Sequence, residues 1–133
     1  MDIIRGGPAS KPGPDDWFTG EVRLQEIAHG EPPSRLRALR VQFTPGARTA
    51  WHSHPVGQVL HVTEGAGRVQ SRGGTVEEIA AGDVVRTPPG EWHWHGAGPQ
   101  SAMTHLALQE ADDHGSTTSW DRHVSDEEYL AGS

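Results

Sequence analysis

Gly46-x5-His52-x-His54-x3-Gln58-x6-Gly65, with x for any residue, is the first of two histidine-bearing stretches in this chain. Its two histidines stand two positions apart. Side chains of a β-strand alternate between its faces, so a strand would project both imidazoles from one face, whereas a helix would need a spacing of three or four. The stretch therefore predicts a strand that carries a pair of histidines.

A second stretch has the spacing Gly82-x5-Pro88-x-Gly90-x2-His93. Together the two stretches resemble the paired motifs of the cupin superfamily, G-x5-H-x-H-x3,4-E-x6-G and G-x5-P-x-G-x2-H-x3-N. Every glycine, every histidine and the proline of these motifs has its counterpart here. The resemblance covers roughly residues 36 to 110, and it implies an all-β fold, a single-domain cupin with a jelly-roll-like β-barrel.

The resemblance also implies a metal centre. The motif positions that bind metal in cupins correspond to His52, His54, Gln58 and His93, which would hold one divalent ion per chain. Gln58 stands where the family usually has glutamate, and Ala97 where it often has asparagine. Three imidazoles and an amide oxygen suit Mn, Fe, Ni, Zn or Co. Four neutral ligands leave the ion its full +2 charge, which favours Lewis-acid over redox chemistry. The alternative is a polar barrel whose histidines bind no metal.

The composition agrees with an all-β domain. The 133 residues include 17 glycines and 10 prolines, too many for a helical bundle of this length, and fit one domain, residues 1–133. A net charge of −7 with a single lysine, Lys11, offers no cationic surface for nucleic acid. There is no cysteine, no basic and apolar leader and no membrane-length apolar run, so we expect a cytoplasmic protein without membrane contact.

The rest of the chain reads as short strands between turns. Residues 1–16 form an irregular arm, because the prolines and glycines of residues 5–16 disfavour pairing. Ser125 and Glu128 have the spacing of a capping box, which predicts a short C-terminal helix over residues 126–131. The expected strands are 21–27, 35–43, 49–54, 58–63, 68–71, 76–79, 84–87, 93–95 and 102–109. A hairpin at 64–67 is expected to join strand 58–63 to strand 68–71.

Strand alternation sorts the remaining side chains. His95 should face inward with His93, and the last strand should turn His105 and Gln109 inward as well. His105 is a candidate general base, and His95 is either a second one or a hydrogen-bond donor to the ligands. We expect a small substrate pocket whose walls are Leu39, Val41, Phe43, Trp51, Leu60, Met103 and Gln109.

The other histidines are expected outside the site. His61 would lie on the outer face of its strand, at the surface or at an interface, and His29, His114 and His123 in solvated loops. The opposite face of the last strand is apolar and needs cover, which predicts a homodimer or homotetramer.

Within the superfamily the chain resembles the manganese-dependent bacterial hydroxynitrile lyases. The resemblance rests on Gln58 and on the runs 16–20, 45–52, 76–78, 93–97 and 102–107. It implies Mn as the ion and the cleavage of (R)-cyanohydrins to aldehyde and hydrogen cyanide, in which His105 moves the hydroxyl proton and His95 holds the departing cyanide. A quercetinase-like dioxygenase and a noncatalytic small-molecule-binding barrel remain alternatives.

Overall fold

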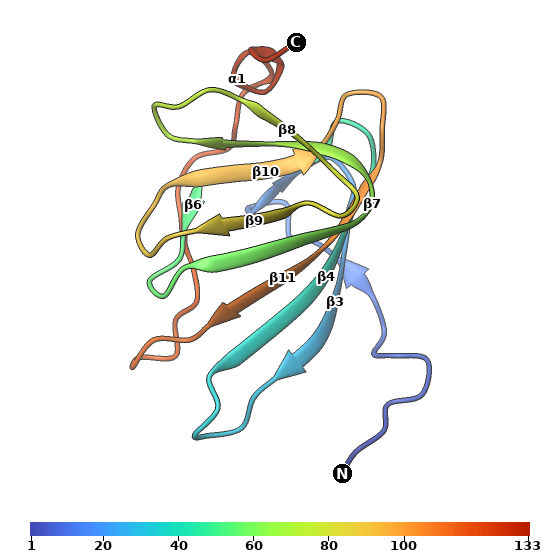
Figure 1. Ribbon diagram of the computed structural model, residues 1–133, viewed down its shortest axis with the longest axis vertical. Coiled ribbons are helices and arrows are strands. Elements are labelled where there is room, and N and C mark those ends of the chain that lie inside the picture. Colours follow the sequence, from blue (N-terminus) through green and yellow to red (C-terminus); the bar gives the residue numbers. More distant parts are fainter.

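The computed structural model describes residues 1–133 and shows a curled β-sheet half-barrel with one short helix (Figure 1). The all-β prediction is thereby confirmed. The elements are β1 (Lys11–Pro12), β2 (Phe18–Thr19), β3 (Val22–His29), β4 (Leu36–Phe43), β5 (Arg48–Thr49), β6 (His52–Ser53), β7 (Gln58–Ser71), β8 (Glu77–Ala80), β9 (Val84–Thr87), β10 (His93–Ala97), β11 (Met103–Glu110), β12 (Ser119–Trp120) and α1 (Asp126–Leu130).

One long strand, β7, joins the two halves of the sheet. The strands follow the order β1-β3-β4-β11-β7-β10-β5-β2, and all pairings are antiparallel. The first half of β7 pairs with β11 and β9, and its second half with β10 and β8. Figure 1 shows how β7 curves from one layer into the other. This curvature brings the motif strands β6, β7 and β10 around one interior.

The hairpin expected at residues 64–67 is wrong, because β7 runs through these positions without a turn. The register against β11 shifts by one residue between Thr104 and His105, which marks a bulge in β7. Gly65 follows this bulge with φ +76°, and a Cβ there would collide with the Ala102 carbonyl. The glycine therefore bends the strand between the two layers instead of reversing it.

Two further differences concern short pairings. The expected strand over residues 49–54 is divided into β5 and β6. The N-terminal arm is irregular except at Lys11–Pro12, which pairs with β3 at the edge of the sheet. Proline is tolerated there because an edge strand can leave one side without a ladder hydrogen bond.

The core has two parts. Apolar side chains of the half-barrel interior pack around Phe43, Val62 and Met103. A second cluster lies outside the sheet, where α1 covers it: Trp51, Trp94, Val124 and Tyr129. The helix begins at Ser125 with the predicted capping box, since the Ser125 side chain accepts from the Glu128 N–H and the Glu128 side chain accepts from the Ser125 N–H. No helix is long and apolar enough to cross a membrane.

Candidate metal centre and active site

The structure brings the histidines of both sequence motifs together. His52 on β6 lies opposite His93 on β10 in the sheet register, with ring centroids 4.3 Å apart. The His54 ring follows β6 and lies 5.0 Å from that of His52 and 5.2 Å from that of His93. All three are buried. The two-residue spacing thus places both imidazoles of the first motif on one side, as alternation requires.

Backbone carbonyls determine which ring nitrogen of each motif histidine is available. The Nδ1–carbonyl pairs are His52 with Ala50 at 2.8 Å, His54 with Thr117 at 2.9 Å and His93 with Glu91 at 3.0 Å. An Nδ1–H that donates to a carbonyl leaves the lone pair on Nε2, which is the tautomer a metal requires. The backbone therefore presents three Nε2 lone pairs to one interior.

Gln58 completes the predicted set from the start of β7. Its Nε2 donates to Gln109 Oε1 at 2.8 Å, which turns its own Oε1 toward the histidines, 3.3 Å from His93 Nε2. Because His93 already donates through Nδ1, its Nε2 carries a lone pair, and this lone pair faces one on Gln58 Oε1 across the 3.3 Å. A cation between them would remove the repulsion, so the donor set fits a divalent ion.

The tightest group of ligand atoms differs from the predicted set. Ligand nitrogens of His52, His93 and His95 all lie within 4.8 Å of one another, so the structure adds His95 to the possible ligands. Its Nδ1 lies 3.0 Å from His105 Nε2, and its Nε2 has no partner. His54 does not belong to this group, although its buried Nε2 has no partner either. The two-residue spacing from His93 was the signal that could have placed His95 there.

Of these side chains, His52, His54, Gln58 and His95 line a cavity of about 290 Å³ together with His105, whereas His93 is buried but does not form part of the lining. Of the predicted pocket residues, Leu39, Val41 and Gln109 line it. Others do not line it: Phe43 and Met103 pack in the apolar cluster of the half-barrel, and Leu60 is fully buried. The remaining lining residues are Trp17, Phe18, Leu24, Thr49, His52, His54, Gln58, His95, His105, Ala107, Thr117, Thr118 and Trp120.

Trp51 was wrongly placed in the pocket. It directly precedes His52 and therefore points to the opposite face of the sheet, where it packs with Trp94 and Tyr129. Trp94 lies on that outer face for the same reason, because it stands between the inward-facing His93 and His95.

The cavity wall formed by Trp17, Phe18, Thr117, Thr118 and Trp120 was missed by the sequence analysis. Trp17 and Phe18 lie just after the N-terminal arm, at the start of β2, and the other three lie in the segment after β11, so all five are outside the two motifs. Only the register of β12 against β6 brings Trp120 opposite His52, and a two-residue strand leaves no periodicity in the sequence.

Comparison with known proteins identifies the family. Residues 39–106 match the family described as the cupin domain. The chain is a cupin. It is 55% identical to the (R)-mandelonitrile lyase of Granulicella tundricola over 130 residues, 97% of this chain and 98% of that protein.

Solved structures agree with this identification. A cupin-like protein of Thermotoga maritima superposes with a TM-score of 0.86 at 38% identity, covering 99% of this chain and 97% of that chain. A polyketide cyclase of Streptomyces resistomycificus has a TM-score of 0.66 at 18% identity, over 97% of this chain and 89% of that chain. The second likeness concerns the fold alone.

The five buried histidines of the candidate site are held neutral. Burial, joined for His52 and His95 by repulsion from neighbouring imidazoles, lowers the pKa of both rings well below its usual range. Burial also lowers the pKa of His93 and of His105 to about 4. The pKa of His54 is lowered by burial as well. No carboxylate lines the cavity. The cavity therefore presents unprotonated imidazole nitrogens, whose lone pairs can bind a metal cation and whose burial disfavours protonation.

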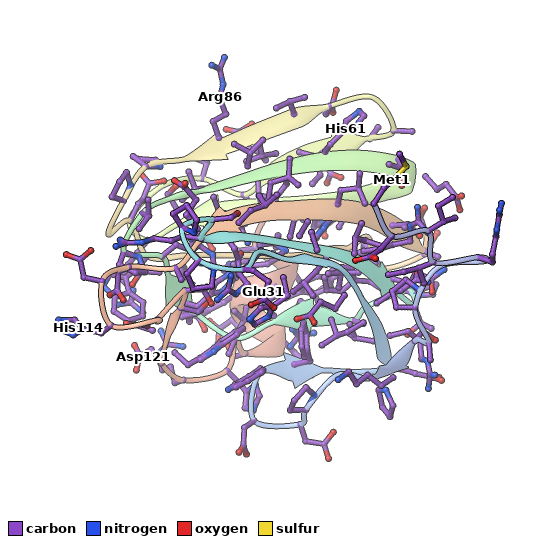
Figure 2. All side chains as sticks on the ribbon, turned by 90° about the horizontal axis from the view of Figure 1, so that it is seen from below. Met1, Glu31, His61, Arg86, His114 and Asp121 are labelled. Atoms are coloured by element: carbon purple, nitrogen blue, oxygen red, sulfur yellow. The ribbon has the colours of Figure 1, made fainter.

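Outside the cavity the remaining histidines are exposed, as expected: His29, His61, His114 and His123. The loop expected at His29 is wrong, because this residue ends strand β3. Figure 2 shows His61 and His114 at the periphery, directed away from the interior. On the outer face of β11, Leu106 is half-buried and Leu108 is exposed.

Proposed function

We propose that this cupin is a metal-dependent lyase of the hydroxynitrile lyase type, which cleaves (R)-cyanohydrins such as mandelonitrile to aldehyde and hydrogen cyanide. The observation that carries the proposal is the 55% identity to an (R)-mandelonitrile lyase across 97% of this chain. The cavity supports it independently, because neutral histidine donors and an apolar wall meet in a space that fits a small organic substrate.

His52, His54, Gln58 and His93 would hold the ion, with His95 adjacent. We propose one divalent ion per chain and favour Mn, with Fe, Ni, Zn and Co as alternatives. When bound, the ion supplies Lewis acidity toward the substrate oxygen. The carbonyl contacts of the three histidines support this assignment, because they orient the rings before any ion arrives.

We assign proton transfer to the His95–His105 pair. Both rings are buried, both line the cavity, and their facing nitrogens lie 3.0 Å apart. The lowered pKa of His105, caused by burial, keeps its imidazole unprotonated at neutral pH. A neutral imidazole can accept the cyanohydrin hydroxyl proton while the C–CN bond breaks and the electron pair leaves with cyanide. The same proton then neutralises cyanide, so the step needs no oxidant or reductant.

The wider organisation is also proposed. We infer that residues 1–133 act as one cupin domain in the cytoplasm, and the cysteine-free composition is compatible with that compartment. A homodimer or homotetramer is proposed from the outer face of β11, where Leu106 and Leu108 lie exposed or half-buried.

The test combines elemental analysis with mandelonitrile cleavage by the Mn-loaded protein. We expect about one metal ion per chain and measurable cleavage. The His52→Ala variant should lose the metal and at least a thousandfold in kcat/KM, while His114→Ala, which removes an exposed imidazole, should change neither. Metal without cleavage would refute the lyase proposal and leave the cupin site intact. Absence of metal under any loading would refute both.

A further inference from the structure

Two tryptophans form a stacked pair at the edge of the cavity. The rings of Trp17 and Trp120 are 5.0 Å apart between centroids and only 4° from parallel. Both line the cavity. Trp17 is 40% exposed, so the pair lies where the cavity meets solvent.

The pair continues inward as an aromatic wall. The Trp120 ring lies 4.7 Å from that of His52, at 31° to it. Phe18 meets Trp120 edge-on at 6.3 Å. An aromatic surface thus runs from one of the proposed metal ligands to the solvent.

Packing of the core does not account for these two indoles. Neither belongs to the interior apolar cluster or to the cluster beneath α1, which contains Trp51 and Trp94. A large aromatic side chain left partly in water forgoes part of its hydrophobic stabilisation, and such surfaces commonly mark a binding site.

Backbone contacts hold the wall in place without a ligand. The Trp17 carbonyl accepts from the Ala50 N–H at 2.8 Å, and the Phe18 side chain is buried. Trp120 pairs through β12 with His52 on β6. A surface that is already ordered loses little entropy when a ligand packs on it.

We propose that Trp17 and Trp120 determine substrate specificity, by offering a preformed surface on which the aromatic ring of an aryl cyanohydrin stacks or packs edge-on. This inference rests on the proposed function, because it assigns the substrate class at that site. Aromatic pairs gain more than their buried area alone provides, up to roughly tenfold in affinity. An aliphatic cyanohydrin lacks that gain.

The experiment compares mandelonitrile with the cyanohydrin of butanal for the wild type, Trp17→Ala and Trp17→Leu. Trp17 is chosen because it does not contact the proposed ligands directly. We expect KM for mandelonitrile to rise about tenfold, with kcat for both substrates and KM for the aliphatic one within about twofold. Leucine keeps an apolar side chain without a ring, so it should behave as alanine does. The matched control is Trp92→Ala, which removes a half-buried indole outside the cavity and should alter none of these values.

A readout without turnover separates this proposal from the proposed function. Calorimetric titration with benzaldehyde and with butanal, alongside metal analysis and circular dichroism, should show weakened binding of benzaldehyde alone in both Trp17 variants at unchanged metal content and fold. Benzaldehyde binding without cleavage by the wild type would refute the lyase proposal and keep the aromatic wall. If the binding of both aldehydes were weakened equally, or the binding of neither changed, the proposal that the tryptophans select aryl substrates would be refuted.

Discussion

Two sets of buried polar side chains lie on opposite faces of the same curled sheet. Inside, the histidines of β6, β10 and β11 face one another, and three buried nitrogens, on His54, His95 and His105, have no partner. Outside, Arg48 donates to the Val124 carbonyl at 2.8 Å and pairs with the Asp126 carboxylate at 2.7 Å.

The same pattern extends to Arg68 on the outer face. Its guanidinium donates to the Tyr129 carbonyl at 3.1 Å and lies 3.2 Å from the Glu78 carboxylate, while both arginines sit over the Tyr129 ring. The charge outside is therefore compensated within the chain and attaches the C-terminal helix. Trp51 Nε1 and Arg68 Nε on the outer face also lack a hydrogen bond, but Arg68 has a carboxylate beside it. The histidine nitrogens inside have neither a hydrogen-bond partner nor a carboxylate, and this difference separates a structural polar set from one that can bind a ligand.

Removing the contacts of the outer arginines should lower the stability of the fold and leave the activity of the proposed site unchanged. The Arg48→Met substitution leaves the Val124 carbonyl without its buried donor, and we expect a loss of about 3 kcal/mol in the free energy of unfolding. Urea denaturation measures it. The exposed pair of Arg35 and Asp113 provides the control, since Arg35→Met should cost less than about 1 kcal/mol. An equal loss in both variants would contradict the distinction.

Acid should destabilise the inner set. Burial lowers the pKa of His93 and His105 to about 4 from 6.5. Between these values the unfolded chain binds protons that the folded chain does not, so stability falls as pH falls from 6.5 toward 4 and is independent of these groups above 7. For the metal-free protein we expect the melting temperature to drop by about 5 °C or more from pH 7 to 5. A constant melting temperature over that range would contradict the burial of neutral histidines.

Gln109 should sharpen the contrast within the inner set, because it touches Gln58 and not the histidines. Its Oε1 orients the Gln58 amide, so Gln109→Leu should weaken metal binding roughly tenfold. Competition with a chelator measures the affinity. Gln109→Glu keeps an acceptor at that position and should retain tighter binding than leucine. Equal affinities in the two variants would show that Gln109 does not position Gln58.

The smallest effect is expected at the capping box. A hydrogen bond from Arg122, with support from Ser125, lowers the pKa of Glu128 to about 2. This stabilisation is present above pH 4.5 and is lost as pH falls toward 2. We expect Glu128→Gln to cost about 0.5 to 1 kcal/mol at pH 7 and less at pH 3, by urea denaturation. The exposed Glu127→Gln is the control, and a cost that does not fall at pH 3 would contradict the ion pair.

Strand alternation explains what the sequence could and could not predict. It placed His95 beside His93 and turned His105 inward, both of which the structure bears out. Alternation also places Trp51 on the face of the sheet opposite His52. The assignment of Trp51 to the pocket was wrong because it followed the hydrophobicity of the side chain and not this alternation. Thr117 and Trp120 could not be found, because their positions depend on the long-range pairing of a two-residue strand.

The contact between His54 and the Thr117 carbonyl has a consequence for the dynamics of the chain. Local opening of residues 117–131 would release the ring that the carbonyl orients, so an ion bound at this centre must oppose that opening by linkage. Amide hydrogens of the C-terminal segment should therefore exchange more slowly when the centre is loaded, even though none of them touches the ion. The opening of the C-terminal segment and the binding of an ion at this centre would therefore be two coupled equilibria.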